Sequence, residues 1–189
     1  MVVCGELKRH LALLMMLSVL AGVGASADAA DKPQSSTMQL SCEAFAEGGE
    51  IPAKFTCDDK NLSPTLKWSG APAGTKNFAL VVDDPDAPMG TWVHWVLYDL
   101  PANAAELGEG EPKAETIPTG GKQGVNDFKQ IGYGGPCPPP GKAHRYMFKL
   151  YALDTALELK PGATKKQLEH AMAKHILAEA QLMGTYKRK

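Results

Sequence analysis

Three apolar segments of strand length, separated by stretches rich in glycine and proline, limit the folds open to this chain. Residues 78–82 (FALVV) form a continuous apolar run that ends at acidic residues and a proline, and a run this short favours a buried strand over a helix. Residues 92–100 and 145–153 carry apolar side chains on both of their alternating faces. Strands of this kind suit the interior of a sandwich of sheets. The sequence therefore predicts one mostly β domain.

Strict alternation along residues 92–100 assigns each side chain to one of two faces. One face carries Val93, Trp95 and Leu97, and the opposite face carries His94, Val96 and Tyr98. A shorter alternating segment at 37–41 predicts a first strand. Residues 101–142 are rich in glycine and proline and lack periodicity, which is typical of a functional loop when it lies inside a compact domain.

The C-terminal segment has the pattern of a helix. Thr164 and Gln167 have the spacing of a capping box, and Gly184 stands where a helix would end. One stripe of the expected helix carries Leu168, Met172, Ile176 and Met183. We therefore expect one substantial helix that ends at Gly184, with His170 and His175 on it as structural or surface residues.

Size and charge exclude several classes of protein. The chain has 189 residues, of which 44% are hydrophobic, and this suits one globular domain and argues against disorder. The 20 Lys and Arg residues nearly balance the 21 Asp and Glu residues. The sequence therefore lacks the positive charge that binds nucleic acid or an acidic membrane surface.

The N-terminus has the layout of a secretory signal peptide. Lys8 and Arg9 precede an apolar run at 11–23, and small residues follow at 25–27. The run is well short of the roughly 20 residues that span a bilayer as a helix, although an uncleaved membrane anchor is the alternative. We expect a signal peptide at 1–27 cleaved after Ala27, a tether at 28–36 and a domain at 37–189. The protein is then periplasmic or secreted.

Cysteine and histidine usage constrains the covalent and metal chemistry. Cleavage removes Cys4 and leaves Cys42, Cys57 and Cys137, so one thiol stays unpaired or pairs between chains. The four remaining histidines lack the close spacing of metal ligands. The sequence predicts neither a metal site nor a cofactor.

Two polar clusters follow the apolar strands. The first is the acidic, proline-containing turn 83–88 with the nearby Trp92 and His94, and the second is the glycine- and proline-rich loop 132–141, which leads into His144-Arg145-Tyr146. Carboxylates on such a turn can orient a histidine, and a glycine-rich loop can present backbone N–H groups to an anion. Structural interpretations remain open: the acidic residues cap turns, the loop is a rigid turn without a ligand, and Arg145 pairs with one of the aspartates.

The motifs DPDAP at 84–88, the W-x-H of Trp92 and His94, and GPCPPPG…HRY at 135–146 resemble the two signature regions of the phosphatidylethanolamine-binding protein family. The likeness is strongest to its bacterial and archaeal branch of Raf-kinase-inhibitor-like proteins, and it extends over nearly the whole chain after the signal peptide. The resemblance implies a two-sheet antiparallel β-sandwich with peripheral helices, including a C-terminal helix. It also implies one pocket for phosphate-like groups.

The resemblance assigns the pocket residue by residue. Those expected to line or support it are Asp84, Asp86, Trp92, His94, His144 and Tyr146. Gly135 and Pro139 are expected at its rim. The resemblance also places Cys57 and Cys137 within the matched core, so we expect a Cys57–Cys137 disulfide with Cys42 free.

We therefore expect an exported small binding protein that holds phosphate, phosphoethanolamine or a similar anionic headgroup. His94 and His144 would donate hydrogen bonds. Asp84 would either orient the His94 ring and raise its pKa, or accept a proton from the ligand's own hydroxyl or amine. The alternative is an inhibitor of a protease or kinase that uses the proline-rich loop. A hydrolytic enzyme is the third class, and we expect none, since neither cluster offers a serine nucleophile elbow or a metal-ligand set. The oligomeric state is left open between monomer and homodimer.

Overall fold

The computed structural model describes residues 37–188. The predicted signal peptide at 1–27, the tether at 28–36 and the last residue of the predicted domain lie outside the described residues. The elements in chain order are β1 (Gln39–Cys42), the short 3-10 helix η1 (Ala53–Phe55), β2 (Leu66–Ser69), β3 (Asn77–Asp84), β4 (Trp92–Pro101), β5 (Glu106–Leu107), β6 (Lys122–Gln123), β7 (His144–Leu153), α1 (Lys165–Met172) and β8 (Ile176–Tyr186).

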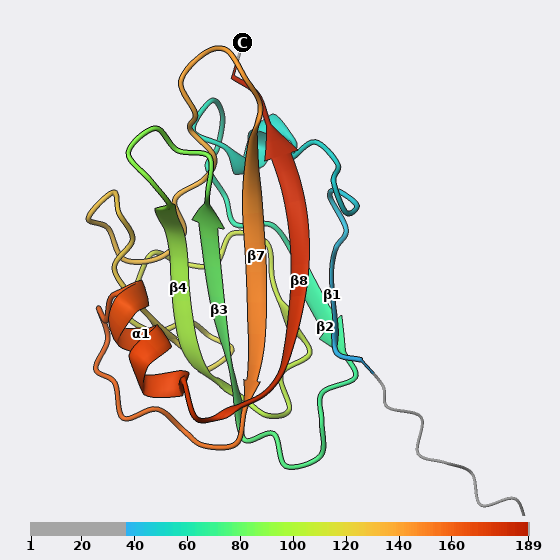
Figure 1. The fold of residues 1–189 in the computed structure, drawn as a ribbon, viewed down its shortest axis with the longest axis vertical. Helices are drawn as coiled ribbons and strands as arrows, with labels where there is room; N and C mark the ends of the chain where they lie inside the picture. Colours follow the sequence, from blue (N-terminus) through green and yellow to red (C-terminus); the bar gives the residue numbers. More distant parts are fainter. Residues whose placement is uncertain (1–36, 189) are drawn as a thin grey trace, which may run out of the picture. The chain divides into compact units, whose positions relative to one another are not determined.

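The strands form two antiparallel sheets, as expected (Figure 1). The larger sheet has the order β6-β4-β3-β7-β8 and the smaller one the order β1-β2-β5. The main hydrophobic core lies between them, where Leu66 and Trp68 of the small sheet meet Leu80, Trp95 and Phe148 of the large one. The prediction of a mostly β sandwich is confirmed.

The outer face of the large sheet carries a second apolar cluster. Leu168 and Met172 of α1 are buried there in the same cluster as Val96 and Tyr98 of β4, and Figure 1 shows α1 beside β4. The predicted capping box starts this helix, since the Thr164 side chain accepts from the backbone N–H three residues on. A helix on the outer face explains why the central strands are apolar on both sides.

The prediction of one long C-terminal helix is wrong beyond Met172. The chain turns there, with the His175 N–H donating to the Met172 carbonyl at 2.9 Å, and continues as β8 along β7. His175 therefore lies in the turn after the helix. Gly184 lies inside β8 and is no helix cap: a Cβ at that position would meet Ile51 Cγ1 at 2.6 Å.

A β-bulge overturns the expected faces of β4 at its first residues. Val82 of β3 pairs with Trp95, whereas the next residue, Asp83, pairs with Val93, so His94 is the additional residue. An inserted residue reverses the alternation on one side of the bulge. Val93 consequently joins the outer apolar cluster, and the His94 ring packs on the inner side against Tyr146.

Candidate functional site

A cavity of about 230 Å³ opens at one end of the large sheet, where β3 ends and β4 and β7 begin. Both polar clusters contribute to its wall, which consists of Asp84, Ala87, Pro88, Met89, Trp92, His94, Phe128, Cys137, Pro138, Pro139 and His144. Five of the eight residues expected at the pocket line it: Asp84, Trp92, His94, Pro139 and His144. The fold therefore brings together two motifs that lie about 40 residues apart in the sequence.

Asp84 and His144 form a buried pair at the base of the cavity. Asp84 ends β3 and is 3% exposed, and His144 begins β7 and is 7% exposed. The His144 Nδ1 lies 2.8 Å from Asp84 Oδ2, and the other carboxylate oxygen accepts the backbone N–H of Asp86 at 2.8 Å. Both oxygens of the carboxylate are thus engaged, and the carboxylate sets the orientation of the His144 ring.

His94 is held by a different group from the one expected. Its Nδ1 donates to the Gly134 carbonyl at 2.6 Å, while the Gly134 N–H donates to the His94 carbonyl at 2.9 Å. The ring edges pack against Tyr146 and Phe128, with centroid distances of 5.1 Å and 5.4 Å. The loop carbonyl therefore orients the His94 ring, and Asp84 orients His144 instead.

The expected rise in the pKa of His94 is also wrong. Burial lowers the pKa of this imidazole, and the effect outweighs the opposing effects of the Gly134 carbonyl and of the Asp84 charge. The ring is only 2% exposed, and the charged form of a base loses most when it is removed from water. His94 is consequently neutral at pH 7, with its proton on Nδ1.

The three aspartates of the first cluster pair with different residues. Asp83 faces the outer side of the sheet and is paired with Lys149 at 3.1 Å and Lys165 at 2.5 Å. Asp86 forms two side-chain hydrogen bonds with Arg145, at 2.8 Å and 2.6 Å. These bonds lower the pKa of Asp86 to about 2. The structural interpretation of Arg145 is thus confirmed.

Asp86 supports the cavity without lining it. Besides the guanidinium, it accepts the backbone N–H of Arg145 at 3.0 Å. The bonds tie the turn after β3 to the beginning of β7, one residue beyond His144. Asp86 therefore holds together the two segments that carry the Asp84–His144 pair.

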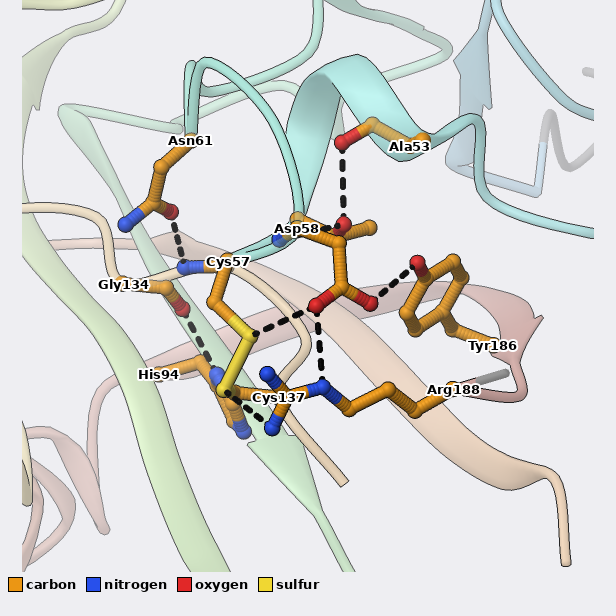
Figure 2. Close-up of a disulfide and its surroundings, with 11 residues drawn as sticks. Ala53, Cys57, Asp58, Asn61, His94, Gly134, Cys137, Tyr186 and Arg188 are labelled. Carbon is orange, nitrogen blue, oxygen red and sulfur yellow. Dashed lines mark hydrogen bonds and ion pairs between the residues drawn. A yellow bond between two sulfur atoms is a disulfide. The ribbon is translucent and has the colours of Figure 1, made fainter. Parts of the chain in front are cut away.

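The loop wall of the cavity is fixed by a disulfide (Figure 2). Cys57 is bonded to Cys137, as expected, and the Cys57 N–H donates to the Pro136 carbonyl at 3.0 Å. Cys137 lines the cavity next to Pro138 and Pro139. Cys42 is a free, half-buried thiol on β1, which agrees with the expected pairing.

Gly135 lies behind this wall and not at the rim, where it was expected. Its N–H donates to Asn61 Oδ1 at 2.7 Å. A Cβ at this position would lie 2.3 Å from the Phe55 carbonyl oxygen. Gly135 is therefore a position of close backbone approach, and it seats the loop against the segment 55–61.

Several cavity residues carried no recognisable sequence signal. Phe128 comes from the long irregular loop, and Met89, at 92% exposure, stands at the mouth of the cavity. Tyr146, which was expected at the pocket, packs beneath His94. Two buried polar groups near the histidines, Trp92 Nε1 and Tyr146 Oη, have no hydrogen-bond partner within residues 37–188. Unpaired buried donors of this kind call for a ligand or water.

The fold and the cavity together describe a small β-sandwich binding protein, and comparison with known proteins gives its family. Residues 41–187 match the family model described as phosphatidylethanolamine-binding protein. The chain is 50% identical over 151 residues to the UPF0098 protein of Methanothermobacter thermautotrophicus, a match covering 80% of this chain and 99% of the relative. It is also 50% identical over 153 residues to the UPF0098 protein of Aquifex aeolicus, covering 80% and 89%.

Two solved structures have the same fold. The Chlamydia trachomatis homologue CT736 is 42% identical with a TM-score of 0.75, covering 82% of this chain and 100% of that one. The Escherichia coli protein YbcL is 34% identical with a TM-score of 0.76, covering 80% and 99%. The chain therefore belongs to the phosphatidylethanolamine-binding protein family, and the resemblance noted in the sequence is confirmed.

Proposed function

We propose that this protein is an exported binding protein whose cavity holds a small phosphate-like anion. The observation that carries the proposal is the pair of imidazoles, His94 and His144, which line one cavity and have their Nδ1 atoms committed to other groups. Each ring is thereby fixed, and its Nε2 is the nitrogen left for a ligand. The Asp84 charge, which would repel an anion, is offset by the two hydrogen bonds that it accepts.

The dimensions of the cavity favour a headgroup over a whole lipid. Its volume of about 230 Å³ is smaller than the roughly 300–1,000 Å³ of sites for drug-sized ligands. The net charge of −1 means that attraction must come from local donors. The Trp92 N–H lacks a hydrogen-bond partner within the described residues and belongs to a side chain that lines the cavity, so it is a suitable donor to a phosphate oxygen.

Binding is favoured over catalysis by the nature of these contacts. Asp84 and His144 form a pair that could act on a proton, but the cavity wall contains no serine, threonine or free thiol, and its one cysteine is in the disulfide. An inhibitor that presents the proline-rich loop to a protein partner is the second candidate. The exposed Pro139 and Pro140, which follow the disulfide-anchored Cys137 in the loop, support it.

Export is supported by two independent features of the chain. The first 27 residues have the signal-peptide layout, and a structural disulfide such as Cys57–Cys137 is typical of proteins in oxidising compartments outside the cytoplasm. We expect N-terminal sequencing of the exported protein to begin at Asp28. A product that keeps Met1 and accumulates in the cytoplasm would contradict this part of the proposal.

Calorimetric titration of the purified protein with phosphate and phosphoethanolamine tests the binding site. We expect His144→Ala to weaken binding by about 1.5–3 kcal/mol, the range for a hydrogen bond to a charged group. His170→Ala, on the exposed side of α1, is the matched control and should bind like wild type. If wild type binds neither ligand at millimolar concentration, the cavity is not an anion site, and the inhibitor function becomes the better candidate.

A further inference from the structure

The His94 ring offers a ligand a hydrogen-bond acceptor, which is unusual for a site that binds anions. A carbonyl oxygen can only accept, so the bond to Gly134 places a proton on Nδ1 in every protonation state of the ring. In the neutral ring, Nε2 then carries a lone pair. Since Nδ1 is engaged by the Gly134 carbonyl, Nε2 is the ring nitrogen left for a ligand in the cavity that His94 lines.

The surroundings of the ring keep it neutral. The charged or titratable groups near it are Asp84 and Asp83 from β3 and His144 and Tyr146 from β7, and the loops contribute the Phe128 ring and the Gly134 carbonyl. Asp83 is already neutralised by two lysines on the opposite face of the sheet. The two aromatic rings hold water away, and this burial lowers the pKa of His94 more than the two carboxylates raise it.

We infer that His94 selects phosphate ligands that have a protonated oxygen, an inference that rests on the proposed anion site. The cavity then binds the P–OH form of a phosphate monoester or of inorganic phosphate. The ligand hydroxyl donates to His94 Nε2, and its charged oxygens accept from the remaining donors of the cavity. No proton is transferred. A fully deprotonated oxygen would instead face the Nε2 lone pair.

This arrangement distinguishes ligands that share the same phosphate chemistry. A monoester has a second pKa of about 6 and carries a proton at and below that pH, whereas a diester and sulfate carry none near neutrality. A site built to hydrogen-bond a substrate hydroxyl strongly rejects analogues that lack it, because its own polar group is left unpaired. The inference therefore favours a free monoester or phosphate over the diester of an intact phospholipid.

Titration calorimetry from pH 5.5 to 8 with methyl phosphate, dimethyl phosphate and sulfate tests the inference. Dimethyl phosphate has the same charge as singly protonated methyl phosphate but no hydroxyl, so it is the matched ligand control. At pH 5.5 we expect methyl phosphate to bind roughly tenfold tighter than dimethyl phosphate or more. Its affinity should then fall by about tenfold per pH unit above pH 7, following the fraction of the protonated ligand.

The two control ligands separate ligand protonation from protonation of the histidines. If His94 were a charged donor, sulfate would also bind more tightly as the pH falls, and His94→Gln would remove this dependence although His144 is still present; this result would overturn the inference while leaving the anion site intact. Equal binding of methyl and dimethyl phosphate would overturn it too. Absence of binding by all three ligands at every pH would instead refute the proposed function itself.

A variant assigns the selectivity to His94. His94→Gln places an amide at this position, which can turn its N–H₂ toward the ligand, and we expect the preference for methyl phosphate to fall to about threefold or less. His170→Gln is the matched control and should keep the wild-type preference. If a folded His94→Gln protein kept the full preference for methyl phosphate over dimethyl phosphate, the assignment of this preference to His94 would be overturned. If the variant does not fold, the titrations of wild type with the three ligands decide the inference.

Discussion

Removal of the Cys57–Cys137 disulfide should cost this domain a large part of its stability. The bond joins residues separated by 80 positions, and the chain-entropy relation for a loop of this length gives about 4.5 kcal/mol at 25 °C. The free energy of unfolding of natural domains is about 5–15 kcal/mol. We therefore expect the Cys57→Ala/Cys137→Ala protein to lose about a third or more of its unfolding free energy, with a midpoint of thermal unfolding lower by about 9–18 °C.

Urea unfolding of the wild-type and double-alanine proteins, followed by tryptophan fluorescence without reductant, measures the effect. Cys42→Ala is the control, because this thiol is free, and it should shift the unfolding free energy far less. Wild type with reductant should approach the double variant. A loss below about 1 kcal/mol with an unchanged dependence on urea would refute the reasoning, since the unfolded chain would then gain little freedom from losing the bond.

Two further predictions concern positions away from the disulfide. Gly184→Ala should destabilise the domain by about 1–3 kcal/mol in the same denaturation experiment, because the added Cβ would lie 2.6 Å from the Ile51 side chain. Gly108→Ala is the control. A Cβ at Gly108 meets nothing closer than 3.8 Å, so this variant should change the unfolding free energy little. Arg145 lowers the pKa of Asp86 to about 2. The ion pair therefore stabilises the fold fully above the unfolded-state pKa of about 4, and this stabilisation is lost as the pH falls toward 2. Asp86→Asn should therefore lose stability at pH 6 but little at pH 2, and an equal loss at both values would contradict this.

The parts of the fold that depend on neighbours in sequence were predictable from the sequence. The strands β3, β4 and β7 appear as short apolar runs because their side chains are buried on both faces, and a two-residue period needs only local information. The capping box at Thr164 is likewise a contact between residues three apart. The resemblance to the family added the disulfide and five of the eleven residues that line the cavity.

Only the tertiary structure decided which residues distant in sequence pair or form hydrogen bonds with one another. The helix prediction failed after Met172 because segment 176–186 is stabilised by its pairing with β7, and a long-range ladder overrides local helix propensity. The bulge at His94 shifts side chains between faces without any local sequence sign. His94 is bound by a carbonyl 40 residues away and His144 by a carboxylate 60 residues away. These distant partners set the proton positions of the two rings, and the chemistry of the cavity follows from them.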